Sequence, residues 1–373
     1  MHSVFIPSMI GDTDSIFVKI ALENEGARAV RMIGDNFPTQ QTSSLYVSDG
    51  GKFTGYYECI NDRTRIAFSD FDVVWLRRPR WPRIPNNLDP RDGKMAKQEC
   101  DHFVRSVFFS AWDSAVWVNS MEGRRRANSK LLQLREAVSL GFPVPTTLVS
   151  NNPNDIREFL DSSDDACIVK PILGTSWIED GRVFVSYTSD IAVDALPADD
   201  AIRACPSIYQ KKIVKEFEVR IVFFGKQSFA LKLHSQDICG AETDWRIVDT
   251  YRLNVAEIVV PDSVHRFCVR LMTKLKIVHG SFDFAVDSNG NWVFFEVNEA
   301  GQFLWMETLA PQLPILDAMT QFLLKPSDDF VYIPGSEINR MTDVAKTQRF
   351  SELLADEKEN EKILTATSVD YSS

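Results

Sequence analysis

The sequence predicts a soluble, mixed α/β protein with two or three domains. Its 373 residues are more than one ordinary hydrophobic core accommodates. Strand and helix patterns alternate in the first third of the chain, whereas strand patterns dominate from Cys167 onward. No apolar run reaches the roughly 18 residues that a membrane-spanning helix needs, so we expect no membrane contact.

The first third of the chain predicts alternating strands and helices. "SVFIPSM" is typical of a strand, "DSIFVKIALENEGA" of an amphipathic helix that ends near Gly26, and "RAVRMI" of a second strand. A polar stretch over residues 43–64 is expected to form a meander. "DFDVVWL" predicts a further strand, which the prolines of "RRPRWPRIP" terminate.

The remainder of the chain begins with two helices and then becomes rich in strands. "QECDHFVRSVFFSAWDSA" and "NSKLLQLREAVSLGF" predict helices, the second with Asn128 as its N-cap and Gly141 at its end. Strands are predicted for "CIVKPI", "RVFVSY", "SIYQKKIV", "EFEVRIVFFG", "QSFALKLHS" and "RIVDTYRL". "LPILDAMTQFLL" predicts a helix, and "ADEKENEK" a solvated helix end followed by a loose tail.

Composition and absent motifs exclude several classes of protein. A formal net charge of −11 argues against general nucleic-acid binding, because phosphate neutralisation needs a basic surface. The six cysteines are scattered, which indicates reduced thiols, and the first ten residues lack the pattern of a secretory signal, so we expect a cytoplasmic protein. The chain has no GxxxxGK(S/T), GxGxxG, GxSxG or HExxH motif.

The segment "HGSFDFAVDSNGNWVFFEVNEAG" predicts a hairpin with the Asn289-Gly290 dipeptide at its tip. A loop of two or four residues places Asp283 opposite Glu296, although like charges at opposed positions destabilise a sheet. Glu296 and Asn298 share a face of their strand, so the site offers two carboxylates and an amide oxygen, a set that suits Mg²⁺. A solvated acidic edge is the alternative.

The same register assigns the apolar residues of the hairpin to two faces. Trp292 and Phe294 are expected near the carboxylates. The opposite face is expected to carry Phe282, Phe284, Val293, Phe295 and Val297. So much apolar area argues against an exposed edge.

Two lysines indicate contacts with phosphate. Lys170 projects from the apolar strand "CIVKP", where an unpaired ammonium group is costly. Gly174, Thr175 and Ser176 follow it and could form a flexible loop that covers a phosphate. Lys130 lies near the positive end of a predicted helix, so an anionic ligand would explain it, and an ordinary surface lysine is the alternative.

The segment "YQKKIVKEFEVR" combines a possible connector with a strand. The backbone of residues 210–214 could hydrogen-bond the edge of an adenine, and Glu218 and Arg220 share one face of the following strand. A salt-bridged surface strand is the alternative.

Together these features follow the order found in ATP-grasp enzymes. Three segments resemble the graspetide synthetases in particular, the ATP-grasp ligases of microviridin-type peptide maturation: "VVWLRRPR", "NSKLLQLREAVSLGFPVPTTLVSNN" and "DFAVDSNGNWVFFEVNEAGQFLWMET". The resemblance covers about residues 3 to 325. It implies an ATP-grasp fold that begins with a pre-ATP-grasp α/β domain over residues 1–120. A central subdomain over 121–209 is expected to cover the nucleotide and to hold a leader peptide. A C-terminal subdomain over 210–335 is expected to carry the Mg²⁺ site, and a helical or disordered tail follows over 336–373.

The resemblance also implies an activity. Such enzymes phosphorylate an Asp or Glu side chain of a ribosomally made precursor peptide, and a Ser or Thr hydroxyl or a Lys amine then attacks, closing an ester or amide ring. The expected partner is a precursor with a leader and an acidic core, and related enzymes are often homodimers. The alternatives are an ATP-grasp ligase that conjugates an amino acid to a peptide or protein end, and a nucleotide-binding module without turnover.

Roles for individual residues follow from the matching positions. Asp283, Glu296 and Asn298 are expected to bind Mg²⁺, and Arg220 and Arg246 to steady the transferring phosphoryl group and the acyl phosphate. The residues expected to bind ATP are Lys130, Lys170, Gly174, Thr175, Ser176, Gln210, Lys211, Ile213 and Glu218.

Two short arginine segments remain beside this set. Arg77 and Arg78 end a predicted strand and are expected to contact the acidic core peptide or to form a clamp beside it. The alternatives for them are a nucleic-acid patch with Trp81 and a structural clamp between domains. Residues 124–126 are expected to form a solvated or phosphate-facing turn. The sequence departs from the usual family pattern where Glu299 follows Asn298 and Phe303 follows Gln302.

Overall fold

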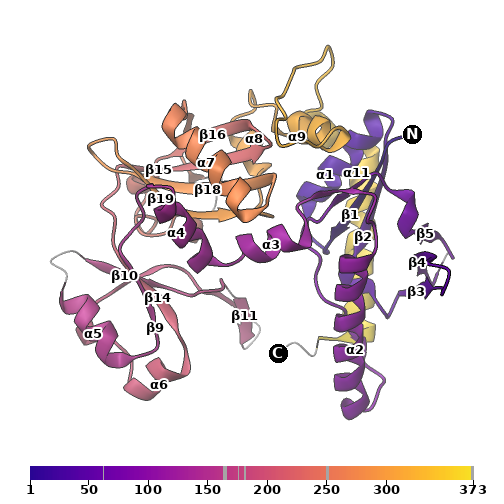
Figure 1. Ribbon diagram of the computed structural model, residues 1–373, viewed down its shortest axis with the longest axis horizontal. Coiled ribbons are helices and arrows are strands. Elements are labelled where there is room, and N and C mark those ends of the chain that lie inside the picture. The colour runs from indigo at the N-terminus through magenta and orange to yellow at the C-terminus, as the bar shows by residue number, and fades with distance from the viewer. Residues whose placement is uncertain (62, 163–165, 175, 180–181, 249–251, 371–373) are drawn as a thin grey trace.

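The computed structural model describes residues 1–373 except for 62, 163–165, 175, 180–181, 249–251 and 371–373. It confirms the mixed α/β class and contains three sheet-based units, which Figure 1 shows as an N-terminal unit, a small central unit and a C-terminal unit. Within the described ranges, every helix is too short or too polar to span a bilayer.

The N-terminal unit is a parallel sheet with helices on both faces. Its strand order is β2-β1-β6-β8, with bounds Arg28–Ile33, Ser3–Ser8, Val73–Trp75 and Val116–Val118. Successive residues of β1 point to opposite faces: Val4 and Ile6 pack with helix α1 (Thr13–Asn24), and Phe5 packs with helix α2 (Pro90–Ser110). Asp89 caps α2 by accepting from the Arg91 N–H at 3.0 Å, so this helix begins before the predicted segment.

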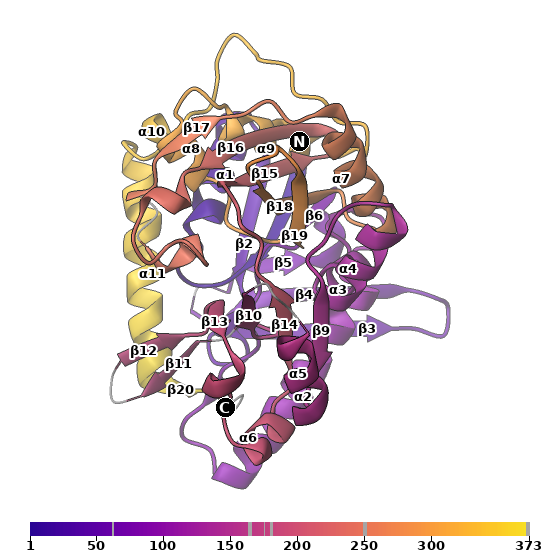
Figure 2. The same ribbon diagram turned by 90° about the vertical axis from the view of Figure 1, so that its left-hand side faces the viewer.

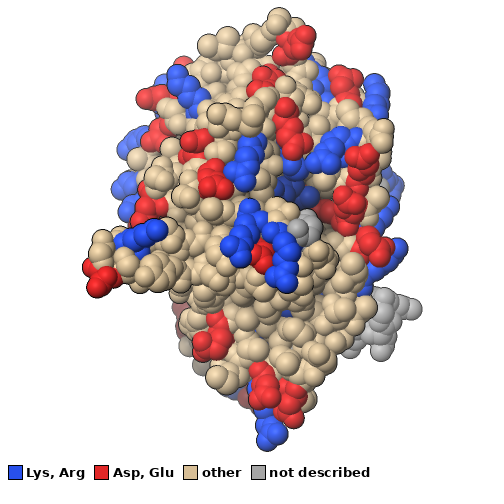
Figure 3. All heavy atoms as spheres, turned by 90° about the vertical axis from the view of Figure 1, so that its right-hand side faces the viewer, with Lys and Arg blue, Asp and Glu red and all other residues tan. Residues whose placement is uncertain are grey.

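The predicted meander is confirmed as a three-stranded antiparallel sheet made of β3 (Gln41–Val47), β4 (Phe53–Cys59) and β5 (Arg65–Ala67). Gly55 of β4 lies against Phe68, whose ring would be 2.5 Å from an added Cβ, so no larger residue fits there. The hairpin of β3 and β4 projects from the face of the molecule shown in Figure 3, where basic and acidic side chains are interspersed.

The central unit is a four-stranded antiparallel sheet with a small core of its own. The strand order is β13-β10-β14-β9, with bounds Ser189–Ile191, Cys167–Lys170, Ser207–Lys211 and Thr147–Ser150. Helices α5 (Pro153–Asp161) and α6 (Asp199–Ala204) supply Ile156, Leu160 and Ile202 to its core. The hairpin of β11 (Ser176–Glu179) and β12 (Arg182–Val185) follows β10.

The C-terminal unit is a five-stranded antiparallel sheet covered on both faces. The order is β17-β16-β15-β18-β19, with bounds Val255–Glu257, Gln227–Leu233, Phe217–Phe224, His279–Val286 and Trp292–Asn298. One face packs against α3 (Met121–Ala127), α4 (Lys130–Ser139) and α7 (Asp262–Leu275). The other shares a single core with α8 (Trp305–Leu309), α9 (Ile315–Leu324) and α1 of the N-terminal unit. The N- and C-terminal units are therefore joined by continuous apolar packing.

The C-terminal tail packs against the N-terminal unit, and the prediction of a loose tail is wrong for its helical part. Helix α11 (Gln348–Thr367) follows α10 (Met341–Val344), and Figures 1 and 2 both show it running alongside α1. The ring of Phe350 packs at a tilt on that of Phe17, and the buried Glu357, within the charged run, pairs with Arg31. Strand β20 (Ser368–Val369) then pairs with β7 (Ile84–Pro85).

Two local predictions at the start of the central segment are wrong. Residues 124–126 lie in helix α3 and do not form a turn, because Ser120 caps that helix by accepting from the Gly123 N–H. Ser129, not Asn128, caps α4, and its hydroxyl accepts from the Leu132 N–H at 3.3 Å. Asn128 instead donates to the Glu299 carboxylate at 3.1 Å.

Candidate functional site

The site is built on the hairpin of β18 and β19, and its predicted register is confirmed at the carboxylates. Asp283 pairs with Glu296, and Ser281 pairs with Asn298. Nearer the tip, however, Phe284 pairs with Phe294, so β19 contains a β-bulge at residue 295.

The tip closes differently from either predicted loop. The Asp287 N–H donates to the Asn291 carbonyl at 3.1 Å, and Gly290 adopts a left-handed φ of 79°. Three residues thus lie between Asp287 and Asn291, and the extra residue in β19 restores the pairing of the carboxylates.

The bulge reverses the faces predicted for residues 292–295. Phe294 is fully buried and packs against Phe267, Phe282 and Phe284. Trp292 also packs on this core, whereas Phe295 lines the pocket. A regular two-residue alternation predicts the opposite arrangement, and it fails here because the bulge inserts one residue. The assignments of Phe282, Phe284 and Val297 to the core face are confirmed.

The two opposed carboxylates are surrounded by cations. Arg220 donates to Asp283 at 2.6 Å, Lys130 pairs with Glu296 at 3.3 Å, and Arg246 lies 4.0 Å from the other Glu296 oxygen. These contacts offset the repulsion that opposed like charges would otherwise cause.

The surroundings set the two carboxyl pKa values apart. Burial raises the pKa of Asp283, and the charge of Glu296 adds to this effect although Arg220 opposes it. Burial acts in the same direction on Glu296, but Lys130, Lys170 and Arg246 together outweigh it and lower its pKa. Glu296 is therefore held ionised beside a carboxyl group that ionises less readily.

The side-chain amide of Asn298 lies between the carboxylates of Asp283 and Glu296, so a single atom can contact both. Its amide nitrogen lies 3.4 Å from Asp283 Oδ2 and 3.2 Å from Glu296 Oε1. A cation at a neighbouring point could therefore bridge the pair, with the amide oxygen turned inward. In the part of the chain that the structure describes, no group of three or more His, Cys, Asp or Glu side chains could hold a metal. Two carboxylates and an amide fit Mg²⁺, which completes its shell with water and phosphate oxygens.

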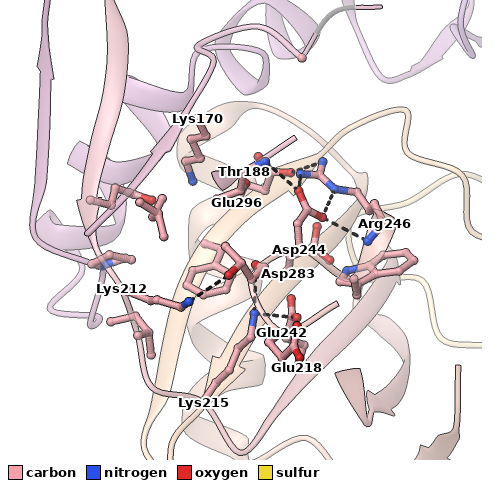
Figure 4. Close-up of a pocket in the computed structure, with 18 of the residues that line it drawn as sticks. Lys170, Thr188, Lys212, Lys215, Glu218, Glu242, Asp244, Arg246, Asp283 and Glu296 are labelled. Atoms are coloured by element: carbon pink, nitrogen blue, oxygen red, sulfur yellow. Dashed lines mark hydrogen bonds and ion pairs between the residues drawn. The ribbon is translucent and has the colours of Figure 1, made fainter. Parts of the chain in front are cut away.

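A first pocket of about 900 Å³, including the part open to solvent, lies between the central and C-terminal sheets. Figure 4 shows Lys170 of β10 near Glu296 of β19, and both line this pocket. Burial lowers the pKa of Lys170 to about 8; Lys130 adds to the shift and Glu296 opposes it. Of the residues expected to bind ATP, the pocket wall includes Lys130, Lys170, Gly174, Gln210, Lys211, Ile213 and Glu218. Thr175 lies outside the described residues, and Ser176 begins strand β11.

The polar groups at the far end of this pocket are held by neighbours. Gln210 is buried and donates to Thr147 Oγ1 at 2.8 Å. Glu218 accepts from Ser235 at 3.0 Å and pairs with Lys215 at 2.8 Å, while burial raises its pKa. Lys215 was not recognised in the sequence, although its spacing of three from Glu218 was visible.

Sequence reasoning also missed the residue that positions Arg246. Asp244 is buried and accepts from Arg246 Nε at 2.8 Å and Nη2 at 2.7 Å. The Thr188 N–H from the central unit donates to Asp244 at 3.2 Å. Figure 4 shows this pair beside Glu296. Asp244 is the N-cap of a short 3₁₀ helix, η5 (Trp245–Ile247), so no strand or helix periodicity marked it in advance.

The structure overturns a substrate-contacting role for Arg77. This side chain is fully buried and contacts Asp12 at 3.2 Å and Asp14 at 3.1 Å. It also donates to the carbonyls of Ala300 at 2.6 Å and Gly301 at 2.9 Å. Arg77 therefore clamps the N-terminal unit to the loop after β19, which is the structural alternative that the sequence left open.

Arg78 lies in a different setting, at a second pocket. This pocket adjoins the first, because Asp283, Trp245 and Arg246 line both. Arg78 is half-buried there and has no side-chain hydrogen bond or ion pair to any described residue. Glu299, at the position that departs from the family pattern, lines the same pocket and is held by Arg124 at 3.4 Å.

Comparisons with known proteins agree with this architecture. The family model for the MvdD pre-ATP grasp domain matches residues 3–125. No curated protein matches the chain. A RiPP-associated ATP-grasp ligase from Chryseobacterium gregarium, solved with ADP and a leader and core peptide, is 26% identical and has a TM-score of 0.77 over 88% of this chain and 98% of that one.

Two macrocyclases from Microcystis aeruginosa MRC are also similar. MdnC, bound with the precursor peptide MdnA, is 25% identical with a TM-score of 0.74, over 86% of this chain and 99% of that one. MdnB is 28% identical with a TM-score of 0.73, over 87% of this chain and all of that one, 100%. The fold is an ATP-grasp fold preceded by a pre-ATP-grasp domain, and the chain is similar over most of its length to RiPP-associated ATP-grasp ligases and macrocyclases.

Proposed function

We propose that this ligase uses ATP to activate Asp or Glu side chains of a ribosomally made precursor peptide and joins them to Ser or Thr hydroxyls or Lys amines. One observation carries the proposal: the lysine-lined first pocket and the arginine-rich second pocket meet at Asp283 and Arg246. A nucleotide in the first pocket and a carboxylate in the second would therefore bring their reacting groups together.

In this proposal the first pocket binds ATP. Lys130 and Lys170 hold the phosphates, the edge formed by Gln210, Lys211 and Ile213 faces the adenine, and Glu218 faces the ribose. Gly174 lines the same pocket, and the expectation that Thr175 and Ser176 act with it on the phosphates stays a prediction. The ADP bound to the Chryseobacterium ligase supports a nucleotide site in this fold.

Asp283, Glu296 and Asn298 would hold Mg²⁺, which neutralises phosphate charge during transfer. These three side chains share one face of the hairpin, and Arg220 and Arg246 extend from the same region. In this proposal both guanidinium groups contact the terminal phosphoryl group as its bond to ADP breaks.

The second pocket would bind the peptide. The guanidinium of Arg78, which has no partner among the residues that the structure describes, can receive a substrate carboxylate in a two-bond contact. An oxygen of the reacting carboxylate attacks the terminal phosphorus of ATP, and ADP leaves with the bonding electrons. The hydroxyl or amine then attacks the acyl carbon, loses its proton, and phosphate leaves. The cyclised peptide has lost one water for each ring.

The test is the intact mass of each small peptide with an acidic core encoded beside the gene, after incubation with the enzyme, ATP and Mg²⁺. We expect loss of water with release of ADP and phosphate, and no loss with Glu296→Gln. A gain of one amino-acid residue would support a conjugating ligase instead. No change in any of these peptides would contradict the proposal.

A further inference from the structure

A third cavity lies at the outer end of the second pocket, between α1, α8 and α10. We call it the apolar groove and define it by Phe17, Trp305, Pro311, Met341 and Ala345, which all line it. Trp305 and the exposed Gln302 line the second pocket as well. The groove is therefore continuous with the pocket in which we place the reacting carboxylate.

The acidic side chains beside the groove are already paired, and Arg340 of its wall donates to the Pro311 carbonyl at 3.0 Å. Asp14 accepts from Arg77 at 3.1 Å and from the Phe303 N–H at 3.1 Å. Glu307 accepts from the N–H groups of Leu316 at 2.7 Å and Met341 at 2.9 Å. The surface that the groove offers to a ligand is thus mainly that of its apolar side chains, which favours an apolar group.

The second pocket offers the opposite chemistry. Arg78 has no partner among the described residues, and Arg124, Arg220 and Arg246 line the same wall. At the junction, the rings of Trp245 and Trp305 lie 5.4 Å apart. An arginine-rich subsite and an apolar one thus adjoin across a pair of tryptophans, an arrangement that suits one ligand carrying both kinds of group.

We propose that the apolar groove binds an apolar or aromatic side chain of the peptide whose Asp or Glu reacts in the second pocket. This inference rests on the proposed function and adds a specificity rule to it: the preferred substrate carries an apolar residue close in sequence to the reacting carboxylate. The groove holds that residue, so the chain leaves the active site between α8 and α10.

Two residues on the rim allow the groove to be filled without disturbing the core. Ala345 and Thr308 are both exposed and line opposite segments of the groove. We expect Ala345→Trp or Thr308→Trp to occupy the space that the ligand needs. Lys346→Trp is the matched control, because Lys346 is also exposed but does not line the groove.

The experiment uses synthetic peptides of Asp, Thr, Ser and Gly that carry one photoreactive p-benzoylphenylalanine at successive positions on either side of the Asp. Each is irradiated with the full-length protein, Mg²⁺ and ADP, and the labelled segment is found by peptide mass mapping. We expect labelling on residues 305–311 or 341–345 from probes with the reactive ring near the Asp. An unlabelled acidic peptide with a Phe at that position should compete.

The variants decide the result. Ala345→Trp and Thr308→Trp should each reduce the labelling at least severalfold, while Lys346→Trp should leave it unchanged. Labelling confined to other segments, equal labelling of all three variants, or no labelling from any position would overturn the proposal. Labelling requires no turnover, so the two proposals can fail separately. If a peptide loses water but does not label the groove, only the proposed binding in the groove is refuted. If a peptide labels the groove but no peptide loses water, only the macrocyclase function is refuted.

Discussion

Two clusters of charged side chains flank the loop that follows β19, and they use the same chemical groups in opposite ways. In the closed cluster, Arg77 is fully buried and bonded to Asp12, Asp14 and two loop carbonyls. In the open cluster, the carboxylates of Asp283 and Glu296 face pockets whose walls carry Lys130, Lys170, Arg220 and Arg246. The closed cluster fixes the loop, and the open one retains positive charge for anionic ligands.

The largest effect should come from opening the closed cluster. Arg77→Met leaves Asp12 and Asp14 buried without their partner, so the free energy of unfolding should fall by about 3–5 kcal/mol. Urea unfolding followed by circular dichroism measures this change. Arg78→Met is the control, because the Arg78 side chain has no partner among the described residues. The stability of this variant should change little, while its kcat/KM for the peptide falls. Equal losses of stability in the two variants would contradict the comparison.

Glu296→Gln tests the open cluster. It removes charge from the candidate Mg²⁺ site but keeps the size of the side chain, so the protein should stay folded, with a lower melting temperature because Lys130, Lys170 and Arg246 lose a counter-charge. Turnover should fall at least about a hundredfold, which corresponds to a rise of about 3 kcal/mol in the activation barrier, because the Mg²⁺ that would neutralise the negative charge of the transition state loses a ligand. ADP release and peptide mass give the rate. Undiminished turnover would remove Glu296 from the site.

The contrast also shows how far the sequence could predict the site. The Asn-Gly dipeptide and the alternating strands placed Asp283 opposite Glu296, and the pairing holds because the three-residue tip and the bulge in β19 offset each other. They could not place Phe294 and Phe295, because a bulge has no marker in a single sequence and reverses the faces beyond it. The polar tail was misjudged since its contacts to α1 come from a few spaced residues such as Phe350. Burial of Arg77 depends on a loop more than 200 residues away in sequence, as its separation of 223 from Ala300 shows.

His279 offers a test of the closed cluster through pH. Burial lowers its pKa to about 4 and the nearby Arg77 adds to the shift, although the hydrogen bond that its Nδ1–H donates to the Phe223 carbonyl at 2.8 Å opposes it. The unfolded chain, with an ordinary value of 6.5, binds the proton more readily than the folded one. This contribution to stability is therefore complete above pH 6.5 and is lost as the pH falls toward 4, by about 3 kcal/mol in total.

The control for this pH effect is His279→Gln, which removes the titrating group. Unfolding free energies measured at intervals from pH 7 to pH 4 should fall less steeply in the variant than in the wild type. Parallel curves for the two proteins would show that His279 does not titrate as the burial of its ring requires.

The smallest effect expected is on nucleotide binding by the open cluster. Lys170→Ala removes one charge-assisted contact to a phosphate, which is worth about 2 kcal/mol, so the Kd for ATP should rise about thirtyfold. Because burial holds the pKa of Lys170 at about 8, binding to the wild type should also weaken as the pH rises above that value, since the amine must then take up a proton when phosphate binds. Calorimetry between pH 7 and pH 9 measures both effects, with the exposed Lys346→Ala as the control. If the Lys170→Ala variant retained the wild-type affinity for ATP and the wild-type pH dependence, Lys170 would not contact the phosphates, and the positive charge of the open cluster would have another role.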